Sequence, residues 1–242
     1  MKSNIRGQSI RRIVLKCSGE ALRKAPDGLS IDPATVQTFA RRIKDALTTG
    51  VQIAIVIGGG NIYRGNVGHS QGIDRNTGDF MGMLATVINA LALQDAFVKA
   101  GIETRVQTAI EMKEIAEPFI LKRAVRHMEK GRTMIFAGGT GNPYFTTDTA
   151  AALRASEIGA DALLKATKVD GVYSDDPLKN PEAVKYDKIS YAKALHGHLK
   201  IMDATAFSLC RENRIPIVVF DFFQDGNIRA VMEGQPLGTL IC

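Results

Sequence analysis

The chain has 242 residues, a net charge of +6 and a sequence pI near 9.3. With 45% hydrophobic and 23% charged residues, its composition is that of an ordinary globular protein, which argues against a disordered or fibrous chain. Positive charge suits nucleic acids or small phosphorylated ligands. Because the basic residues are scattered along most of the chain, we expect phosphorylated ligands and do not expect nucleic-acid binding.

The predicted elements follow one repeating pattern along the chain. A helix-like stretch ends at a glycine, which can take the left-handed conformation just past a helix, and a short apolar run follows. Near-continuous apolar runs are typical of strands covered on both faces, as in a parallel sheet. The glycines are Gly50, Gly101, Gly131 and Gly159, and the predicted strands are 13–17, 51–57, 102–107, 132–137, 160–166 and 215–220.

The helix starts carry capping signals. Asp32 followed by Pro33 is an N-cap with proline at the first helical position, and Ser190 and Asp225 are weaker caps. We therefore expect a three-layer α/β/α sandwich with a mainly parallel central sheet, in which residues 1–242 form a single domain. The predicted helices are 33–49, 79–100, 111–130, 148–158, 190–196, 203–213 and 226–233.

The three cysteines, Cys17, Cys210 and Cys242, are widely spaced and form no CxxC motif. This spacing argues against a disulfide scaffold or zinc ribbon and favours a reducing compartment. No apolar run approaches the roughly 20 residues of a membrane span, and no apolar stretch typical of a signal peptide follows the basic N-terminus. We expect a cytoplasmic protein that does not enter a membrane.

The first glycine-rich turn, IGGGNIYRG, runs from Ile57 to Gly65 directly after a predicted strand. Glycines let the backbone approach a ligand and point several N–H groups at an anion, and Arg64 would add a fixed positive charge. The alternative is a tight strand-to-helix turn with no ligand. Standard nucleotide motifs are absent, because GxxxxGK[ST] does not occur and Tyr63 stands where GxGxxG needs its third glycine.

The second turn, FAGGTGNPYFTTD, runs from Phe136 to Asp148 and enters a predicted helix. It combines flexible backbone with hydroxyl, amide and aromatic side chains, which is typical of a ligand-binding loop. Thr146 or Thr147 could cap the helix, whose N-terminus favours an anion. As a plain loop, Asn142 followed by Pro143 is ordinary turn chemistry.

Two lysines interrupt or end apolar strands. Lys165 ends the strand in LLKATKVDGVYSDDP, and a buried charge needs a partner such as a phosphate. Lys16 in IVLKCSGE is a candidate second phosphate ligand, or alternatively a solvated lysine on an edge strand. Tyr173 could flank a nucleobase, whereas Asp170 and the following glycine are best explained as a hairpin turn.

The remaining features favour packing roles. The stretch MGMLATVINALAL (81–93) is apolar nearly all round, which is typical of a buried or subunit-packing helix. The four histidines show no metal-ligand spacing with a cysteine. Cys17 is better explained as a small buried hydrophobic residue than as a reactive thiol.

Taken together, these motifs resemble the bacterial uridylate kinases of the amino acid kinase superfamily over nearly the whole chain. MGMLAT and TGNPYFTTD are specific to uridylate kinases, whereas kinases of carbamate, aspartate or glutamate differ there. The matching stretches are KCSGEAL from Lys16, GGGNIYRG from Gly58, DFMGMLAT from Asp79, GTGNPYFTTD from Gly139, LKATKVDGVY from Leu164 and LGTLI from Leu237.

The resemblance implies transfer of the ATP γ-phosphoryl group to UMP in pyrimidine nucleotide biosynthesis, with Mg²⁺ bound through ATP and no metal ligand from the protein. The acceptor site would be mostly N-terminal and the ATP site mostly C-terminal. The implied catalytic residues are Lys16, Lys165 and Asp148. The implied ATP contacts are Lys16, Cys17, Ser18, Gly19, Gly60, Arg64, Thr167, Tyr173 and Asp176. The implied UMP contacts are Gly59, Asp79, Thr140, Gly141, Asn142, Pro143, Tyr144, Phe145, Thr146 and Thr147.

The resemblance also implies a homo-oligomer, most often a hexamer, with UTP as an inhibitor and GTP as a candidate activator. The segment near Arg23 to Leu29 departs from the family's commonest glycine-rich form, which argues against GTP activation. A non-catalytic nucleotide sensor would use the same glycine loops but would not need both lysines. A nucleic-acid-binding regulator would use the basic surface.

Overall fold

The computed structural model describes residues 4–25, 28–64, 72–177, 179–197, 199 and 201–242. Within them, nine strands form one sheet in the order β11-β13-β12-β8-β3-β4-β7-β5-β6, and every pairing is parallel except β12 with β13. The strands are β3 (Arg12–Cys17), β4 (Gln52–Ile57), β5 (Thr104–Thr108), β6 (Glu117–Pro118), β7 (Thr133–Ala137), β8 (Ala162–Thr167), β11 (Lys188–Ile189), β12 (Ile217–Asp221) and β13 (Thr239–Ile241).

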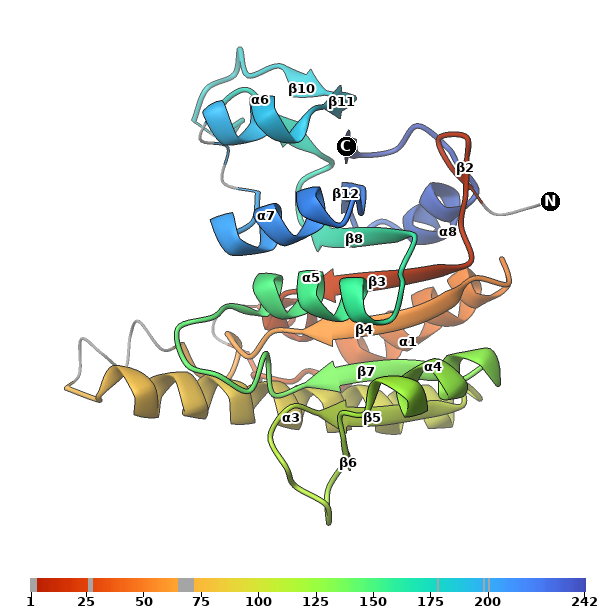
Figure 1. Cartoon of the computed structure of the whole chain (residues 1–242), viewed down its shortest axis with the longest axis vertical. Coiled ribbons are helices and arrows are strands. Elements are labelled where there is room, and N and C mark those ends of the chain that lie inside the picture. Colours follow the sequence, from red (N-terminus) through yellow and green to blue (C-terminus); the bar gives the residue numbers. More distant parts are fainter. Residues whose placement is uncertain (1–3, 26–27, 65–71, 178, 198, 200) are drawn as a thin grey trace.

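Helices cover both faces of this sheet (Figure 1). One face carries α1 (Pro33–Leu47), α3 (Arg75–Lys99) and α8 (Asn227–Met232). The other carries α4 (Leu121–Glu129), α5 (Thr147–Glu157), α6 (Tyr191–His196) and α7 (Ala204–Glu212). The expected three-layer sandwich with a mainly parallel sheet is confirmed.

Two short hairpins lie outside the main sheet. β1 (Asn4–Ile5) pairs with β2 (Gln8–Ser9), and β9 (Val172–Tyr173) pairs with β10 (Lys185–Tyr186). A 3₁₀-helix, η1 (Gly19–Leu22), directly follows β3 and its N-cap Ser18.

The two-sided burial of the sheet follows from the strand sequences. In β3, the side chains of Ile13, Leu15 and Cys17 enter the core layer under α1, α3 and α8. Val14 packs in the opposite layer, under α5 and α7. Because side chains alternate along a strand, Lys16 also points to the α5 side. The apolar pattern of the strand therefore fixes the direction of its one charged side chain.

Most capping predictions are confirmed. The Asp32 carboxylate accepts from the Thr35 N–H at 2.8 Å, and Ser190 accepts from the Lys193 N–H at 3.2 Å. The prediction for Asp225 was wrong: Gly226 is the N-cap of α8, and Asp225 instead pairs with Arg42. The four glycines predicted to follow helices all have positive φ, between 63° and 78°.

Two helix boundaries differ from the prediction by more than two residues. The segment predicted as a helix over 111–130 is helical only from Leu121, because Pro118 has no N–H to continue a helix and lies instead in the edge strand β6. Helix α3 begins at Arg75, before the predicted start at Asp79, since the Asp74 side chain caps it by accepting from the Asn76 N–H.

Helix α3 has a mean hydropathy of 1.5 over its most apolar 18 residues. By length and composition it is the one helix of the described residues that could cross a membrane, a feature that the search for apolar runs missed. Half of this window is buried. Leu93 and Phe97 of α3 pack in the core beneath the sheet, which is typical of the core helix of a sandwich.

Candidate active site

The glycine-rich turns meet at one edge of the sheet. Strands β3, β7 and β8 point the same way in Figure 1, and their carboxyl ends lie beside the start of α5. In open α/β sheets, ligands bind outside the carboxyl ends of the strands. The two loops predicted to bind ligands, after β4 and after β7, both begin at this edge.

Lys16 and Lys165 lie side by side at this edge. They are paired residues of the adjacent parallel strands β3 and β8. Strand β3 is the fifth of the nine strands, so the alternative of a solvated lysine on an edge strand is excluded for Lys16. Lys16 is only 9% exposed, and such a buried cation needs a partner.

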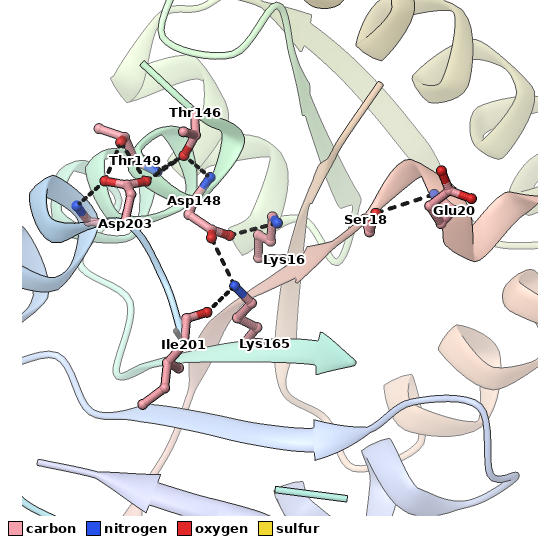
Figure 2. A network of polar contacts seen from close by, with 10 residues as sticks. Lys16, Ser18, Glu20, Thr146, Asp148, Thr149, Lys165, Ile201 and Asp203 are labelled. Carbon is pink, nitrogen blue, oxygen red and sulfur yellow. Dashed lines mark hydrogen bonds and ion pairs between the residues drawn. The ribbon is translucent and has the colours of Figure 1, made fainter. Parts of the chain in front are cut away.

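Asp148 is that partner, and it binds both lysines. Its Oδ1 lies 2.6 Å from the Nζ of Lys16, and its Oδ2 lies 2.8 Å from the Nζ of Lys165 (Figure 2). Asp148 stands in the first turn of α5, where the helix dipole also favours an anion. The three residues that the resemblance implied as catalytic are therefore joined by ion pairs.

The charges in this cluster alter each other's protonation. Burial alone would raise the pKa of Asp148, but the two lysines outweigh it and hold that pKa below its ordinary value. Burial lowers the pKa of Lys165, and the attraction of Asp148 offsets only part of this effect. The cluster holds two cations against one anion, so its geometry suits a further anion such as a phosphate.

Sequence reasoning missed a second layer of support around this cluster. Asp203, the N-cap of α7, accepts hydrogen bonds from the hydroxyls of Thr146, the N-cap of α5, and of Thr149 within α5 (Figure 2). Two residues earlier, the carbonyl oxygen of Ile201 accepts from Lys165 Nζ. The segment entering α7 thus holds both the start of α5 and one lysine. The only signal in the sequence was an aspartate at the first residue of the predicted helix 203–213, a position where an N-cap is common.

The glycines after β4 have packing roles. A Cβ on Gly59 would lie 2.7 Å from the Gly82 carbonyl oxygen and 2.8 Å from the Ala85 Cβ on α3. The turn is also fixed by paired amides, since Asn89 donates to the Gly58 carbonyl and to Asn61 Oδ1, each at 2.7 Å. The tight-turn explanation therefore accounts for Gly59, and it does not exclude a ligand on the open side.

A cavity of about 150 Å³ opens between this turn, α3 and the loop before α5. Among the residues expected to contact UMP, Gly59, Asp79, Thr140, Asn142, Phe145, Thr146 and Thr147 line it. Gly141, Pro143 and Tyr144 belong to the same loop but do not line it, whereas Gly60, expected to contact ATP, does. Residues that sequence reasoning missed complete the wall: Tyr63, Gly78, Gly82, Met83, Thr86 and Gly139.

Asp79 of α3 holds the loop 140–147, which precedes and enters α5. Its Oδ2 accepts from Arg75 Nε at 2.8 Å and from the Tyr144 N–H at 2.7 Å. The Arg75 guanidinium lies over the Tyr144 ring, 5.3 Å from its centre. Tyr144 has a φ of 72°, an uncommon conformation for a bulky residue. The Asp79 carboxylate thus holds a strained backbone in place beside the cavity.

A larger cavity of about 560 Å³ opens beside Lys165, which lines it. Thr167, Tyr173 and Asp176, three of the residues expected to contact ATP, line it together with Lys165. The hairpin-turn prediction for Asp170 was wrong, because β8 and β9 do not pair and β9 instead pairs with β10. Asp170 binds the Tyr173 hydroxyl and the Lys185 ammonium.

The remaining expected ATP contacts follow β3. Ser18 lines a further cavity of about 290 Å³ with Thr167 and Lys168. The Cys17 side chain is fully buried on the opposite face of β3, and burial raises the pKa of its thiol to about 12. A side-chain contact of Cys17 with ATP is therefore excluded. Arg64, half exposed, pairs with Glu20 at 2.5 Å.

A protein-held metal cage is absent from the described residues, where no three His, Cys, Asp or Glu side chains come together. Of the candidate effector segment near Arg23 to Leu29, residues 26–27 lie outside the described residues, as do Gly65 of the first glycine-rich turn and His198.

Comparison with known proteins gives concordant matches. The family model described as the amino acid kinase family matches residues 11–221. The solved structure of a UMP kinase from Bacillus anthracis is 38% identical, with a TM-score of 0.93 over 96% of each chain. A UMP kinase from Ureaplasma parvum is 39% identical, with a TM-score of 0.90 over 97% of this chain and 99% of its own. A uridylate kinase from Archaeoglobus fulgidus is 28% identical, with a TM-score of 0.73 over 95% and 99%.

Proposed function

The chain belongs to the amino acid kinase family and, within it, to the UMP kinases, and we propose that it transfers the γ-phosphoryl group of ATP to UMP, giving UDP and ADP. The observation that carries this function is the buried cluster in which Asp148 binds both Lys16 and Lys165. Lys165 lines the larger cavity, and Thr147, next to Asp148 in the chain, lines the smaller one. The cluster therefore lies between two cavities that suit a donor and an acceptor.

Phosphoryl transfer asks little covalent chemistry of a protein. It requires two anionic groups held in line and the charge that develops on the transferred group neutralised. Lys16 and Lys165 act as the two cations that flank the transferred phosphoryl group. Asp148 orients both ammonium groups, and Asp203 holds the helix from which Asp148 projects. A general base is not needed, because the UMP phosphate is already an anion near neutral pH.

Mg²⁺ fits this site as an ion carried by the nucleotide. Mg²⁺ usually keeps several waters and binds substrate phosphates with one or two carboxylates. Near the lysines, Asp148 and Asp203 are already committed to protein partners. The ATP phosphates would thus supply most ligands, and the ion would neutralise charge on them.

The proposed substrate contacts divide between the cavities. UMP lies against Gly59, Asp79 and the loop 140–147, with its phosphate toward the N-terminus of α5. ATP lies along Ser18, Gly19 and Thr167 toward Tyr173 and Asp176, and Lys16 adjoins both ligands. As in the family, we place the acceptor site mostly in the N-terminal part and the donor site mostly in the C-terminal part of one domain of residues 1–242. The loop 140–147 then reaches the acceptor from the second half of the chain, and Ser18 and Gly19 reach the donor from the first half.

The identity of the acceptor is tested with a substrate panel. ADP release from ATP is followed with UMP, CMP, carbamate, aspartate and glutamate. We expect UMP to be used far better than CMP, because main-chain and amide groups of the acceptor loop read the uracil edge. A site built on hydrogen bonds rejects a base that leaves its polar groups unpaired. Comparable kcat/KM for CMP and UMP would contradict the proposal, and ATP binding with no acceptor turnover would favour a sensor.

The assembly proposed is a homo-oligomer, most simply a hexamer of paired subunits. Three large apolar side chains on α3, Phe80, Leu84 and Ile88, are spaced four residues apart, and each is at least 43% exposed. That spacing puts them on one face of the helix. An exposed apolar stripe suits a self-complementary contact between two copies about a two-fold axis.

We also propose a cellular setting and a regulation for this protein, both on the basis of its family membership. The protein acts in the cytoplasm in pyrimidine nucleotide biosynthesis, with UTP as inhibitor. GTP is a candidate activator only, because residues 23–29 depart from the glycine-rich form. Initial rates at fixed ATP and UMP, with each nucleotide added separately, test both effectors.

A further inference from the structure

Three side chains form a clamp at the far end of the larger cavity. Asp170 Oδ1 accepts from the Tyr173 hydroxyl at 2.7 Å, and Asp170 Oδ2 accepts from Lys185 Nζ at 2.8 Å. Tyr173 and Lys185 are directly paired across β9 and β10. One carboxylate thus joins a ring on one strand to an ammonium on its neighbour.

The backbone beneath this clamp is fixed independently. The Val172 N–H donates to Thr239 Oγ1 at 2.8 Å, and the Thr239 hydroxyl donates to the Tyr186 carbonyl. A Cβ at position 171 would lie 2.7 Å from Lys185 Cε and 2.7 Å from Thr239 Oγ1, so any larger residue there would displace one of these two side chains. The hairpin is therefore held against β13, and the freedom that remains at Tyr173 is rotation of its side chain.

The clamp removes that freedom without entering the cavity. Tyr173 lines the larger cavity, whereas Asp170 and Lys185 do not. The hydrogen bond to Asp170 raises the pKa of the Tyr173 hydroxyl. The bonds from Lys185 and Tyr173 lower the pKa of Asp170. The carboxylate is therefore charged, and the phenol protonated, over the whole neutral range.

We propose that Asp170 and Lys185 are positioning residues for ATP, which hold the Tyr173 ring as a fixed wall for the nucleobase. The inference rests on the proposed function, in which the larger cavity takes ATP. A wall that is ordered before binding does not have to be immobilised by the ligand, so affinity is gained without a new contact. Neither residue touches the reacting groups, so the effect falls on ATP affinity and not on the chemical step.

The test measures the Kd for ATP by calorimetry without UMP, together with KM for each substrate and kcat. We expect Asp170→Ala and Lys185→Met to weaken ATP binding by about three- to tenfold, the effect of one side chain left to be ordered on binding. KM for UMP and kcat stay near wild type. Asp170→Asn keeps an oxygen for the Tyr173 hydroxyl and should recover part of the affinity.

The matched controls are Glu182→Gln and Lys188→Met, which change the same charges at exposed positions nearby. A double-mutant cycle gives the sharper readout, because Asp170→Ala should have little effect in a Tyr173→Phe background, which lacks the hydroxyl. The tyrosinate absorbance near 295 nm should also appear at lower pH in Asp170→Ala, whose Tyr173 has lost its carboxylate partner.

The proposal is overturned if the Kd for ATP stays within about twofold of wild type in both variants, or if Asp170→Ala and Tyr173→Phe weaken binding additively. It is also overturned if the variants raise KM for UMP as much as they weaken ATP binding, which is the result expected of general destabilisation. Calorimetry with ATP alone keeps this test separate from the proposed function, since it needs no phosphorylation of UMP.

Discussion

Lys16 and Lys165 stand directly opposite one another on adjacent parallel strands, and a single carboxylate, that of Asp148, lies within 2.8 Å of both ammonium groups. Two like charges this close would repel, so the arrangement requires the anion between them. Among these three side chains one positive charge remains, which the nearby Asp203 offsets only in part. A transferred phosphoryl group can neutralise this surplus positive charge. The attraction between them is strongest in the transition state, when negative charge builds up on the phosphoryl group.

The first prediction concerns the two lysines. Removing a preorganised cation at a transferred group typically costs about 10²–10³ in rate, or about 3–4 kcal/mol. We therefore expect Lys16→Met and Lys165→Met each to lower kcat steeply with little change in KM for UMP. Arg64→Ala, on the exposed loop beside Glu20, should instead raise KM for nucleotide. Steady-state kinetics on the three variants tests this prediction. If a lysine variant keeps kcat within about threefold of wild type, a change of under 1 kcal/mol in activation free energy, the proposed role of that lysine is contradicted.

The second prediction concerns pH. Because burial lowers the pKa of Lys165, this lysine loses its proton below its ordinary value of 10.5, and kcat/KM should fall at alkaline pH from that lower point. Asp148 raises the same pKa, so Asp148→Asn should move the alkaline limb of kcat/KM to still lower pH. The profile is measured for wild type and variant at subsaturating substrate. An alkaline limb that stays where it is, or moves upward, would count against this coupling.

The sheet and the two lysines at its strand ends could be predicted from sequence because local patterns determine them, whereas the role of Asp148 between the lysines was implied only by the resemblance to the family. Continuous apolar runs followed by glycine turns indicated the buried parallel strands, and a charge inside such a run required a partner. The alternation along β3 that buries Cys17 on one face sends Lys16 to the other.

Contacts between residues far apart in the sequence left no such pattern. Asp203 is 57 residues from Thr146, and Lys185 is 15 residues from Asp170. Their roles depend on which helix and hairpin fold onto the site. The Asp170 turn was misassigned for the same reason, because Asp and Gly together fit a two-residue hairpin and only the tertiary pairing of β9 with β10 excludes it.

The third prediction uses the cysteines as probes of burial. Burial raises the pKa of both the Cys17 and the Cys210 thiols to about 12, whereas Cys242 is exposed. Only a thiolate reacts readily, so a thiol reagent near neutral pH should label one cysteine per native chain and three in denaturant. In Cys242→Ser the native label should disappear. Rapid native labelling of Cys17 would mean that β3 opens at its carboxyl end.

The fourth prediction concerns the apolar stripe of α3. If Phe80, Leu84 and Ile88 bury against a second copy, Leu84→Glu should dissociate the assembly, because a charge would enter an apolar contact without a partner. Sedimentation at micromolar concentration measures the effect, with Ile115→Glu, an exposed apolar position outside α3, as the control. A wild-type monomer at this concentration would rule out the proposed oligomer.

The last prediction separates two roles that Asp79 could have. Both of its bonds, from Arg75 and from the Tyr144 N–H, use Oδ2, which leaves Oδ1 for a ribose hydroxyl of UMP. Asp79→Asn should raise KM for UMP more than KM for ATP, because a carboxylate binds a hydroxyl more strongly than an amide oxygen does. Arg75→Met is the control, since it removes one partner of Asp79 and leaves the carboxylate in place.

A deoxyribose substrate makes this test specific. If Asp79 binds the 2′-hydroxyl, Asp79→Asn should raise KM several-fold for UMP but much less for 2′-deoxy-UMP, which lacks that group. If Asp79 only holds the strained backbone of Tyr144, the variant should impair both substrates equally. Equal losses, or a larger effect on ATP than on UMP, would therefore assign Asp79 to the loop and leave the ribose to other residues of the cavity.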